Sequence, residues 1–139
     1  MSVAVSTHRA RLVWEAGEDR RAHRLELADQ MLAASSAREF GGDGAKADPE
    51  EMLVAALSSC HMLWFMSLAR EERLRVASYE DDAEGTLDGH RFTGAVLRPR
   101  VGWEGPAPDA DTVADLHHRA HDLCFISNSV NFQVEVDAR

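Results

Sequence analysis

The chain has 139 residues, of which 45% are hydrophobic and 28% are charged, and its formal net charge at pH 7 is -9. Most chains of this length form one domain that buries about two thirds of the unfolded surface. We therefore predict a single domain over residues 1–139. The composition excludes a disordered or fibrous protein. Nucleic-acid binding needs clustered Lys and Arg, so this acidic chain is expected to have no nucleic-acid partner.

Two short strands are predicted near the start of the chain, over residues 9–14 and 21–27. The second of them alternates apolar and charged side chains, as a half-buried strand does. Residues 31–47 end in the Gly-rich stretch GGDGAKAD, which lacks the Lys-Ser/Thr pair of a phosphate-binding loop and is interpreted as a connector. The first residues lack the long apolar core of a signal peptide, so we expect a cytoplasmic protein.

A long helix is predicted from Asp48 to about Arg73. Asp48 is a suitable N-cap, Pro49 suits the first helical position, and Glu51 can close a capping box. The second half of the helix is apolar on nearly all sides, so other elements should enclose it. The uncharged segment 52–69 is long enough to span a membrane. It contains serines, a histidine and a cysteine, and the amphipathic strands need a covering helix, so we expect a core helix and no membrane partner.

Strands are predicted over residues 74–87 and 92–103, followed by a second helix over 111–123 and a last strand over 130–137. The last strand alternates valine and phenylalanine with polar residues. The order of elements is therefore two strands, a long helix, two strands, a helix and a strand. This order is typical of an α+β fold with mostly antiparallel pairing.

The chain has two cysteines, Cys60 in the long helix and Cys124 at the end of the second helix. In a reducing compartment such cysteines are small core residues, metal ligands or redox catalysts more often than structural disulfides. A helix C-terminus carries partial negative charge and disfavours a thiolate. If one thiol is the nucleophile, Cys60 is therefore the better candidate and Cys124 is its resolving partner.

Histidines offer an alternative role for the same region. His117, His121 and Cys124 share one helical face at positions i, i+4 and i+7, and together with Cys60 they could bind zinc. Histidines on the exposed side of an amphipathic helix are commoner than metal ligands. We therefore expect no metal site.

Three sequence blocks follow a pattern that is typical of one family: DPEEML at 48–53, AALSSC at 55–60 and CFIS at 124–127. From about residue 38 to the C-terminus the chain resembles the OsmC/Ohr family of peroxide-detoxifying proteins. The resemblance implies an OsmC-like α+β fold, with antiparallel sheets around long central helices in an intertwined homodimer. It also implies a thiol-dependent peroxidase for organic hydroperoxides, with hydrogen peroxide as a second candidate substrate, working under oxidative stress.

The resemblance also assigns the site. Cys60 is similar to the peroxidatic cysteine, Cys124 to the resolving cysteine, Glu50 to the family's carboxylate and Arg38 to the arginine that serves the thiolate. Arg20 or Arg21 is the alternative to Arg38, as in Ohr-type members. Arginine stays protonated and can stabilise a thiolate, while a carboxylate fixes its direction. The chemistry requires no metal or organic cofactor, and an external dithiol, such as a lipoylated or thioredoxin-like protein, would reduce the disulfide.

The positions of Glu50 and Cys60 predict a dimer. They are ten residues apart on one predicted helix, which is about 15 Å along its axis. Unless the helix is broken, Glu50 must act on the Cys60 of a second chain in a symmetric dimer.

Two positions depart from the family's usual pattern and indicate a separate branch. Phe125 replaces the usual Pro, and His61 directly follows the reactive cysteine. The alternative function is a non-catalytic protein of the same fold that binds a small hydrophobic molecule, with incidental cysteines.

Overall fold

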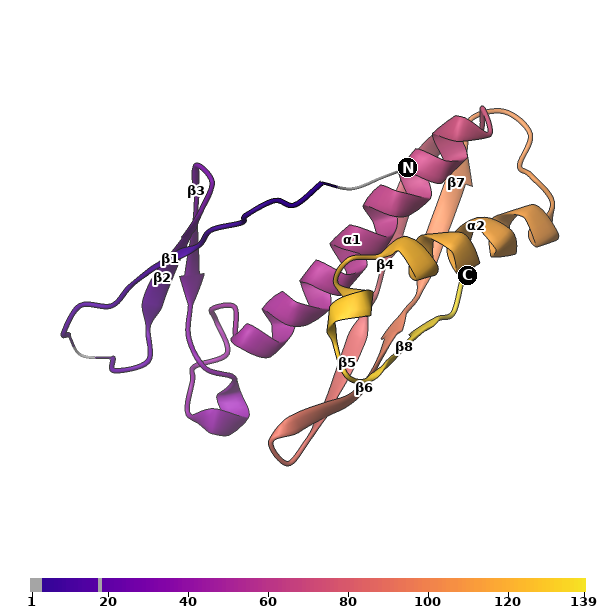
Figure 1. Cartoon of the computed structure of the whole chain (residues 1–139). Coiled ribbons are helices and arrows are strands. Elements are labelled where there is room, and N and C mark those ends of the chain that lie inside the picture. Colours follow the sequence, from indigo (N-terminus) through magenta and orange to yellow (C-terminus); the bar gives the residue numbers. More distant parts are fainter. Residues whose placement is uncertain (1–3, 18) are drawn as a thin grey trace. The chain divides into compact units, whose positions relative to one another are not determined.

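The computed structural model describes residues 4–17 and 19–139 (Figure 1). These residues fall into two compact units, which meet in the sequence between Met52 and Leu53. The elements are, in chain order, β1 (Arg11–Val13), β2 (His23–Leu27), β3 (Gln30–Ala34), the short 3-10 helix η1 (Arg38–Phe40), α1 (Pro49–Glu71), β4 (Val76–Asp81), β5 (Glu84–Asp88), β6 (Arg91–Leu97), β7 (Pro99–Trp103), α2 (Ala110–Leu123), the 3-10 helix η2 (Ser127–Ser129) and β8 (Gln133–Val136). The prediction of one domain stays a prediction.

The first unit contains an antiparallel sheet in the order β1-β2-β3. The two predicted strands are present, with narrower bounds. Strand β3 was not predicted, because its sequence QMLAA has little β-propensity and its turn carries no glycine or asparagine. In that turn Ala28 adopts a φ of 52°, a left-handed conformation that is unusual for alanine.

Helix α1 begins where the sequence predicts. The Asp48 backbone N–H donates to Glu51 Oε1 (3.0 Å), and the Glu51 N–H donates to Asp48 Oδ1 (2.7 Å), so the capping box is complete. The helix ends at Glu71, two residues before the predicted end. Arg73 then adopts a φ of 61°, and the Leu74 N–H donates to the Ala69 carbonyl, as in a left-handed helix terminus.

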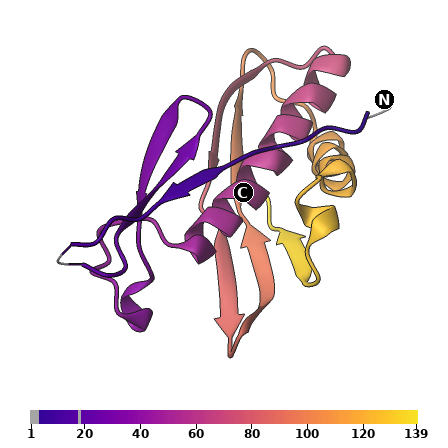
Figure 2. The same ribbon diagram turned by 60° about the vertical axis from the view of Figure 1, so that its left-hand side comes forward.

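The second unit places α2 alongside α1, with β5 and β6 forming a long hairpin (Figures 1 and 2). Strand β4 pairs with β7, and β6 pairs antiparallel with β5 and parallel with β8. The α+β class with mostly antiparallel pairing is therefore confirmed. The prediction of two long strands over 74–87 and 92–103 was wrong, because each is broken into two.

The breaks have a common cause in Asp81. Its carboxylate accepts the backbone N–H of Arg98 (2.6 Å) and the hydroxyl of Ser58 (2.5 Å). These bonds join the two break points to each other and to α1. Hydrogen bonds between residues so far apart in the sequence cannot be predicted from a local pattern. The sequence over 74–87 and over 92–103 therefore predicts one continuous strand in each range.

Two groups of buried side chains hold the second unit together. The larger one joins α1, α2, β4 and β7, and its fully buried centre is Trp64, Phe65, Leu68, Ala69, Leu116 and Ala120. The smaller one joins α1, β6 and β8 through Leu57, Ala95, Leu97 and Val134. By length and composition α1 could cross a membrane, but the core helix of a soluble protein passes the same test. Here α1 is the central element of both groups, as predicted.

Candidate thiol site

Helices α1 and α2 bring the two cysteines together. Cys60 is half-buried on α1 and packs against the larger hydrophobic group. Cys124 directly follows α2, where it is 1% exposed. Both are free thiols, and Cys60 is close enough to Cys124 to raise its pKa. Two residues that are 64 positions apart in the sequence are thus neighbours in the fold.

The surroundings of Cys124 keep it protonated at neutral pH. Burial is the largest effect and, with the neighbouring Cys60, raises the pKa of Cys124 to about 11. The backbone N–H of Ser127 donates to Cys124 Sγ (3.4 Å), and this bond acts in the opposite direction. Desolvation of the thiolate is therefore a second reason, beside the helix terminus, to expect Cys124 to be the poorer nucleophile, and this role stays a prediction.

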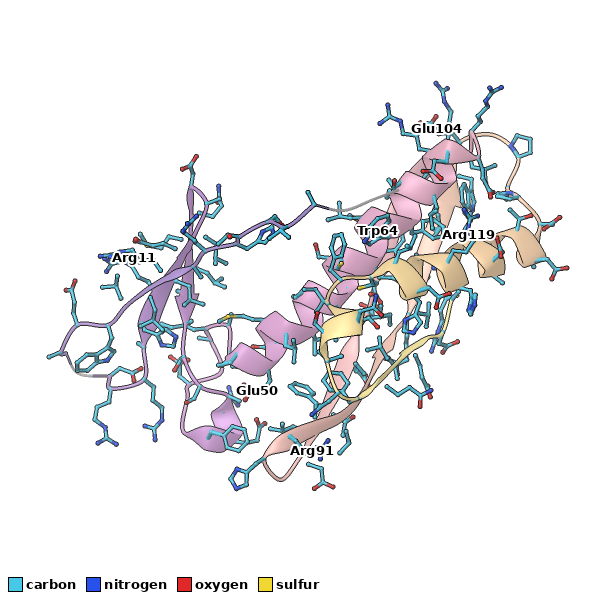
Figure 3. The ribbon with its side chains drawn as sticks, viewed as in Figure 1. Arg11, Glu50, Trp64, Arg91, Glu104 and Arg119 are labelled. Atoms are coloured by element: carbon cyan, nitrogen blue, oxygen red, sulfur yellow. The ribbon has the colours of Figure 1, made fainter. Side chains whose placement is uncertain are left out.

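The predicted carboxylate and arginines lie in the first unit. Glu50 is in the first turn of α1, as Figure 3 shows. The Arg38 Nη2 donates to the Asp43 carbonyl (3.2 Å), and the Arg21 Nε donates to the Phe40 carbonyl (3.1 Å). Within the described residues neither arginine, nor Arg20, forms an ion pair with Glu50. The single chain therefore assembles the two thiols and leaves the carboxylate and arginine roles as predictions.

A buried histidine pair was not predicted. His61 and His117 are 1% and 4% exposed, and their rings stack with centroids 5.3 Å apart and an angle of 7° between planes. His61 Nε2 lies 3.0 Å from His117 Nδ1. Desolvation is the main reason why the pKa of each imidazole falls to about 4. Phe65 stacks on His117 (4.3 Å between centroids), so the pair is part of the core.

The sequence indicates only part of this arrangement of the two histidines. His117 shares a helical face with Cys124, and His61 follows Cys60. No local pattern in either helix predicts that the face with His61 packs against the face with His117. The expectation that the histidines of the second helix are mostly exposed was wrong for His117.

The alternative zinc site is not assembled. Among residues 4–17 and 19–139, no three His, Cys, Asp or Glu side chains are grouped as metal ligands. The His117 Nδ1 faces His61, and His121 Nδ1 lies 3.4 Å from the Ser127 hydroxyl.

A pocket of about 380 Å³ lies at the end of α1, lined by Met66, Ser67, Arg70, Leu74 and Val76. Its lining includes neither cysteine. It is therefore a feature separate from the pair of thiols.

Known proteins agree on the fold. A model of a family described as OsmC-like protein matches residues 41–139. The structure of an OsmC-like protein of unknown function from Vibrio cholerae is 36% identical, with a TM-score of 0.91 over 97% of this chain and 100% of that one. No curated protein matches the chain.

More distant structures share the fold alone. An organic hydroperoxide resistance protein OsmC from Legionella pneumophila is 20% identical, with a TM-score of 0.72 over 97% of this chain and 96% of that one. An organic hydroperoxide resistance protein from Elizabethkingia anophelis is 16% identical, with a TM-score of 0.73 over 97% and 95% of the two chains.

Proposed function

The chain belongs to the OsmC family, and we propose that it is a thiol-dependent peroxidase that reduces organic hydroperoxides. The observation that supports this most directly is that two free thiols, half-buried Cys60 and buried Cys124, are neighbours in the fold. Two structural relatives are named organic hydroperoxide resistance proteins, and this name agrees with the proposed chemistry. The enzyme would act in the cytoplasm on organic hydroperoxides, and hydrogen peroxide is a second substrate to test.

The proposed reaction has two steps on the protein. The Cys60 thiolate attacks the distal peroxide oxygen, the O–O bond breaks, and the alkoxide leaves and takes a proton to become an alcohol. Cys124 then attacks the resulting Cys60 sulfenic acid, so an S–S bond replaces the S–O bond and water leaves. An external dithiol, such as a lipoylated or thioredoxin-like protein, reduces the disulfide and returns both thiols.

Glu50 and an arginine complete the proposed site. Arg38, or in its place Arg20 or Arg21, would stabilise the Cys60 thiolate, and Glu50 would hold the guanidinium in a bidentate pair. Helix α1 is unbroken from Pro49 to Glu71, so Glu50 and Cys60 are about 15 Å apart along its axis. Glu50 would therefore serve the Cys60 of a partner chain.

Exposed apolar side chains support a homodimer. Leu63 and Met66 on α1 are 60% and 37% exposed, although the sequence predicts that this half of the helix is enclosed. Leu123 and Phe125, at the end of α2, are 40% and 50% exposed. Exposed apolar residues on both helices that hold the thiols are typical of a surface that a second subunit covers.

Peroxide consumption tests the proposed function. Without a reductant, wild type is expected to consume one equivalent of cumene hydroperoxide per chain and to lose both titratable thiols. Cys124→Ser is expected to consume one equivalent as well, and to retain a Cys60 sulfenic acid that dimedone traps. With excess dithiol, wild type should turn over. Both metal content and free thiols are measured before the peroxide is added.

If wild type leaves the peroxide untouched and both thiols stay titratable, the chain is not a peroxidase.

Mixing Cys60→Ser chains with Glu50→Gln chains, each expected to be inactive alone, tests whether Glu50 serves the Cys60 of a partner chain. In a dimer whose sites combine Cys60 of one chain with Glu50 of the other, exchange between Cys60→Ser and Glu50→Gln chains restores one complete site in each mixed dimer. About a quarter of the wild-type activity per chain is then expected after random exchange. Glu51→Gln, which keeps the capping contact, is the matched control. No recovery in a mixture that has exchanged subunits would contradict the shared site.

A further inference from the structure

Phe125 is an aromatic residue next to the thiols, and the proposed reaction gives it no role. It directly follows Cys124 and is half-exposed. Trp64 lies one turn after Cys60 on the same face of α1, about 6 Å further along the helix axis (Figure 3). The two rings meet edge to face, with centroids 5.3 Å apart and an angle of 73° between planes. One aromatic pair therefore joins the helix that carries Cys60 to the residue that follows Cys124.

Local hydrogen bonds fix the backbone around Phe125. The Cys124 carbonyl accepts the Asn128 N–H (3.0 Å), so the residues between them form a single helical turn. The Phe125 carbonyl accepts the Ser129 hydroxyl (2.7 Å). These bonds, together with the contact to Trp64, hold the Phe125 ring in one place beside the thiols.

The backbone of this turn does not require a phenylalanine. It would accept proline, the residue that the family usually has at this position. Cys124 has φ and ψ of -64° and 116°, an extended conformation that a residue before proline adopts. The Phe125 N–H donates to no group among the described residues, and proline is common at the first position of a helical turn. The reason for an aromatic ring here is therefore to be sought in what the ring contacts.

The aromatic pair is at a suitable distance from Cys60 to contact the organic group of a peroxide. In the proposed first step the attacked oxygen approaches the sulfur to about 3 Å, so the organic group begins one oxygen further out. Phe125 follows Cys124, the neighbour of Cys60, and contacts Trp64, which is one helical turn from Cys60. Because Trp64 is buried, the exposed part of the pair is the Phe125 ring.

We propose that the exposed face of Phe125 contacts the organic group of the hydroperoxide and makes the site selective for aromatic hydroperoxides. A contact between two rings is worth more than the burial of the same apolar area, and a small alkyl group in the same place lacks it. This inference rests on the proposed function and narrows its substrate class. Phe125 also belongs to the apolar surface of the proposed dimer, so the test includes a purely subunit contact as one outcome.

Two hydroperoxides that differ in one substituent measure this contact. Cumene hydroperoxide has a phenyl group where tert-butyl hydroperoxide has a methyl group. The kcat/KM of each is measured with excess dithiol for wild type, Phe125→Leu, Phe125→Pro and Phe125→Tyr. The ratio of kcat/KM for the cumene compound to that for the tert-butyl compound is expected to fall about five- to tenfold in Phe125→Leu and Phe125→Pro. Phe125→Tyr keeps the ring and should keep the wild-type ratio.

Two controls separate selectivity from a structural role. A change in the reactivity of Cys60 alters both kcat/KM values alike and cancels in their ratio. Turnover of tert-butyl hydroperoxide should stay near the wild-type value in all three Phe125 variants, which also shows that they are folded. Phe92→Leu is the matched control, because Phe92 forms a second aromatic pair with Phe132, also with centroids 5.3 Å apart. It is expected to show the wild-type ratio.

Phe125→Leu and Phe125→Pro chains that keep the wild-type ratio would overturn the inference and leave the proposed function intact. The same holds if sedimentation shows that these variants lose the dimer and both peroxides are consumed more slowly by the same factor, since Phe125 would then be a subunit contact. A wild type that consumes neither peroxide would overturn the proposed function and the inference with it.

Discussion

The Cys60→Ser variant is expected to lose all turnover of cumene hydroperoxide, a fall of at least about 10³-fold below wild type. Serine keeps the size of the side chain, but its hydroxyl does not ionise at neutral pH and cannot form a sulfenic acid. The loss should appear both with excess dithiol and in a single turnover. Peroxide consumption and dimedone labelling measure it directly.

The control for this variant is Ser59→Ala, which changes the exposed neighbour of Cys60 on the same turn of α1. It should retain turnover. If Cys60→Ser still consumed peroxide and Cys124→Ser did not, the roles of the two thiols would be reversed. That outcome would require a base for Cys124 in the first step, since burial keeps it protonated.

Acid is expected to destabilise the protein well before its carboxylates are all protonated. The pKa of each buried imidazole is about 4 in the folded chain, against 6.5 for a free histidine. Above about pH 6.5 both states are neutral at these positions and the free energy of unfolding does not depend on them. As the pH falls from 6.5 to 4, the unfolded chain binds protons first, so stability decreases. The loss is on the order of 3 kcal/mol for each imidazole.

Urea unfolding at about pH 7, pH 5.5 and pH 4.5 measures this effect. A double variant, His61→Gln with His117→Asn, keeps the polar contact without its titration and should lose much less stability over that range. His118→Asn should show the wild-type dependence, because the His118 ring is exposed beside Asp122 and is not part of the buried pair. Equal acid sensitivity of wild type and the double variant would assign the effect to other groups.

The sequence predicts best where structure is decided by neighbouring residues. The capping box of Asp48 and Glu51 is local, and so α1 begins at the predicted residue. The long helix follows from its capping residues and its uncharged length, the second helix follows from apolar periodicity, and the cysteine blocks carry the family resemblance. Together these features were sufficient for the fold class.

Tertiary contacts decide the features that the sequence analysis missed. Strand β4 ends, and β6 gives way to β7, where Asp81 accepts the Arg98 N–H, and these two residues are 17 positions apart. The His61–His117 pair depends on how two helices face each other. The arginine of the site stays open for a similar reason, since Arg21 and Arg38 contact loop carbonyls whose positions no local pattern specifies.

The proximity of Cys60 and Cys124 has a consequence for the stability of the two redox forms. A disulfide between them would close a loop of 64 residues and join the centre of α1 to the segment that leads from α2 into β8. Closing a loop of that size removes chain entropy from the unfolded state, which is worth about 4 kcal/mol. The oxidised protein would then resist unfolding and proteolysis better than the reduced one. Under the proposed function, exposure to peroxide would therefore also stabilise the protein.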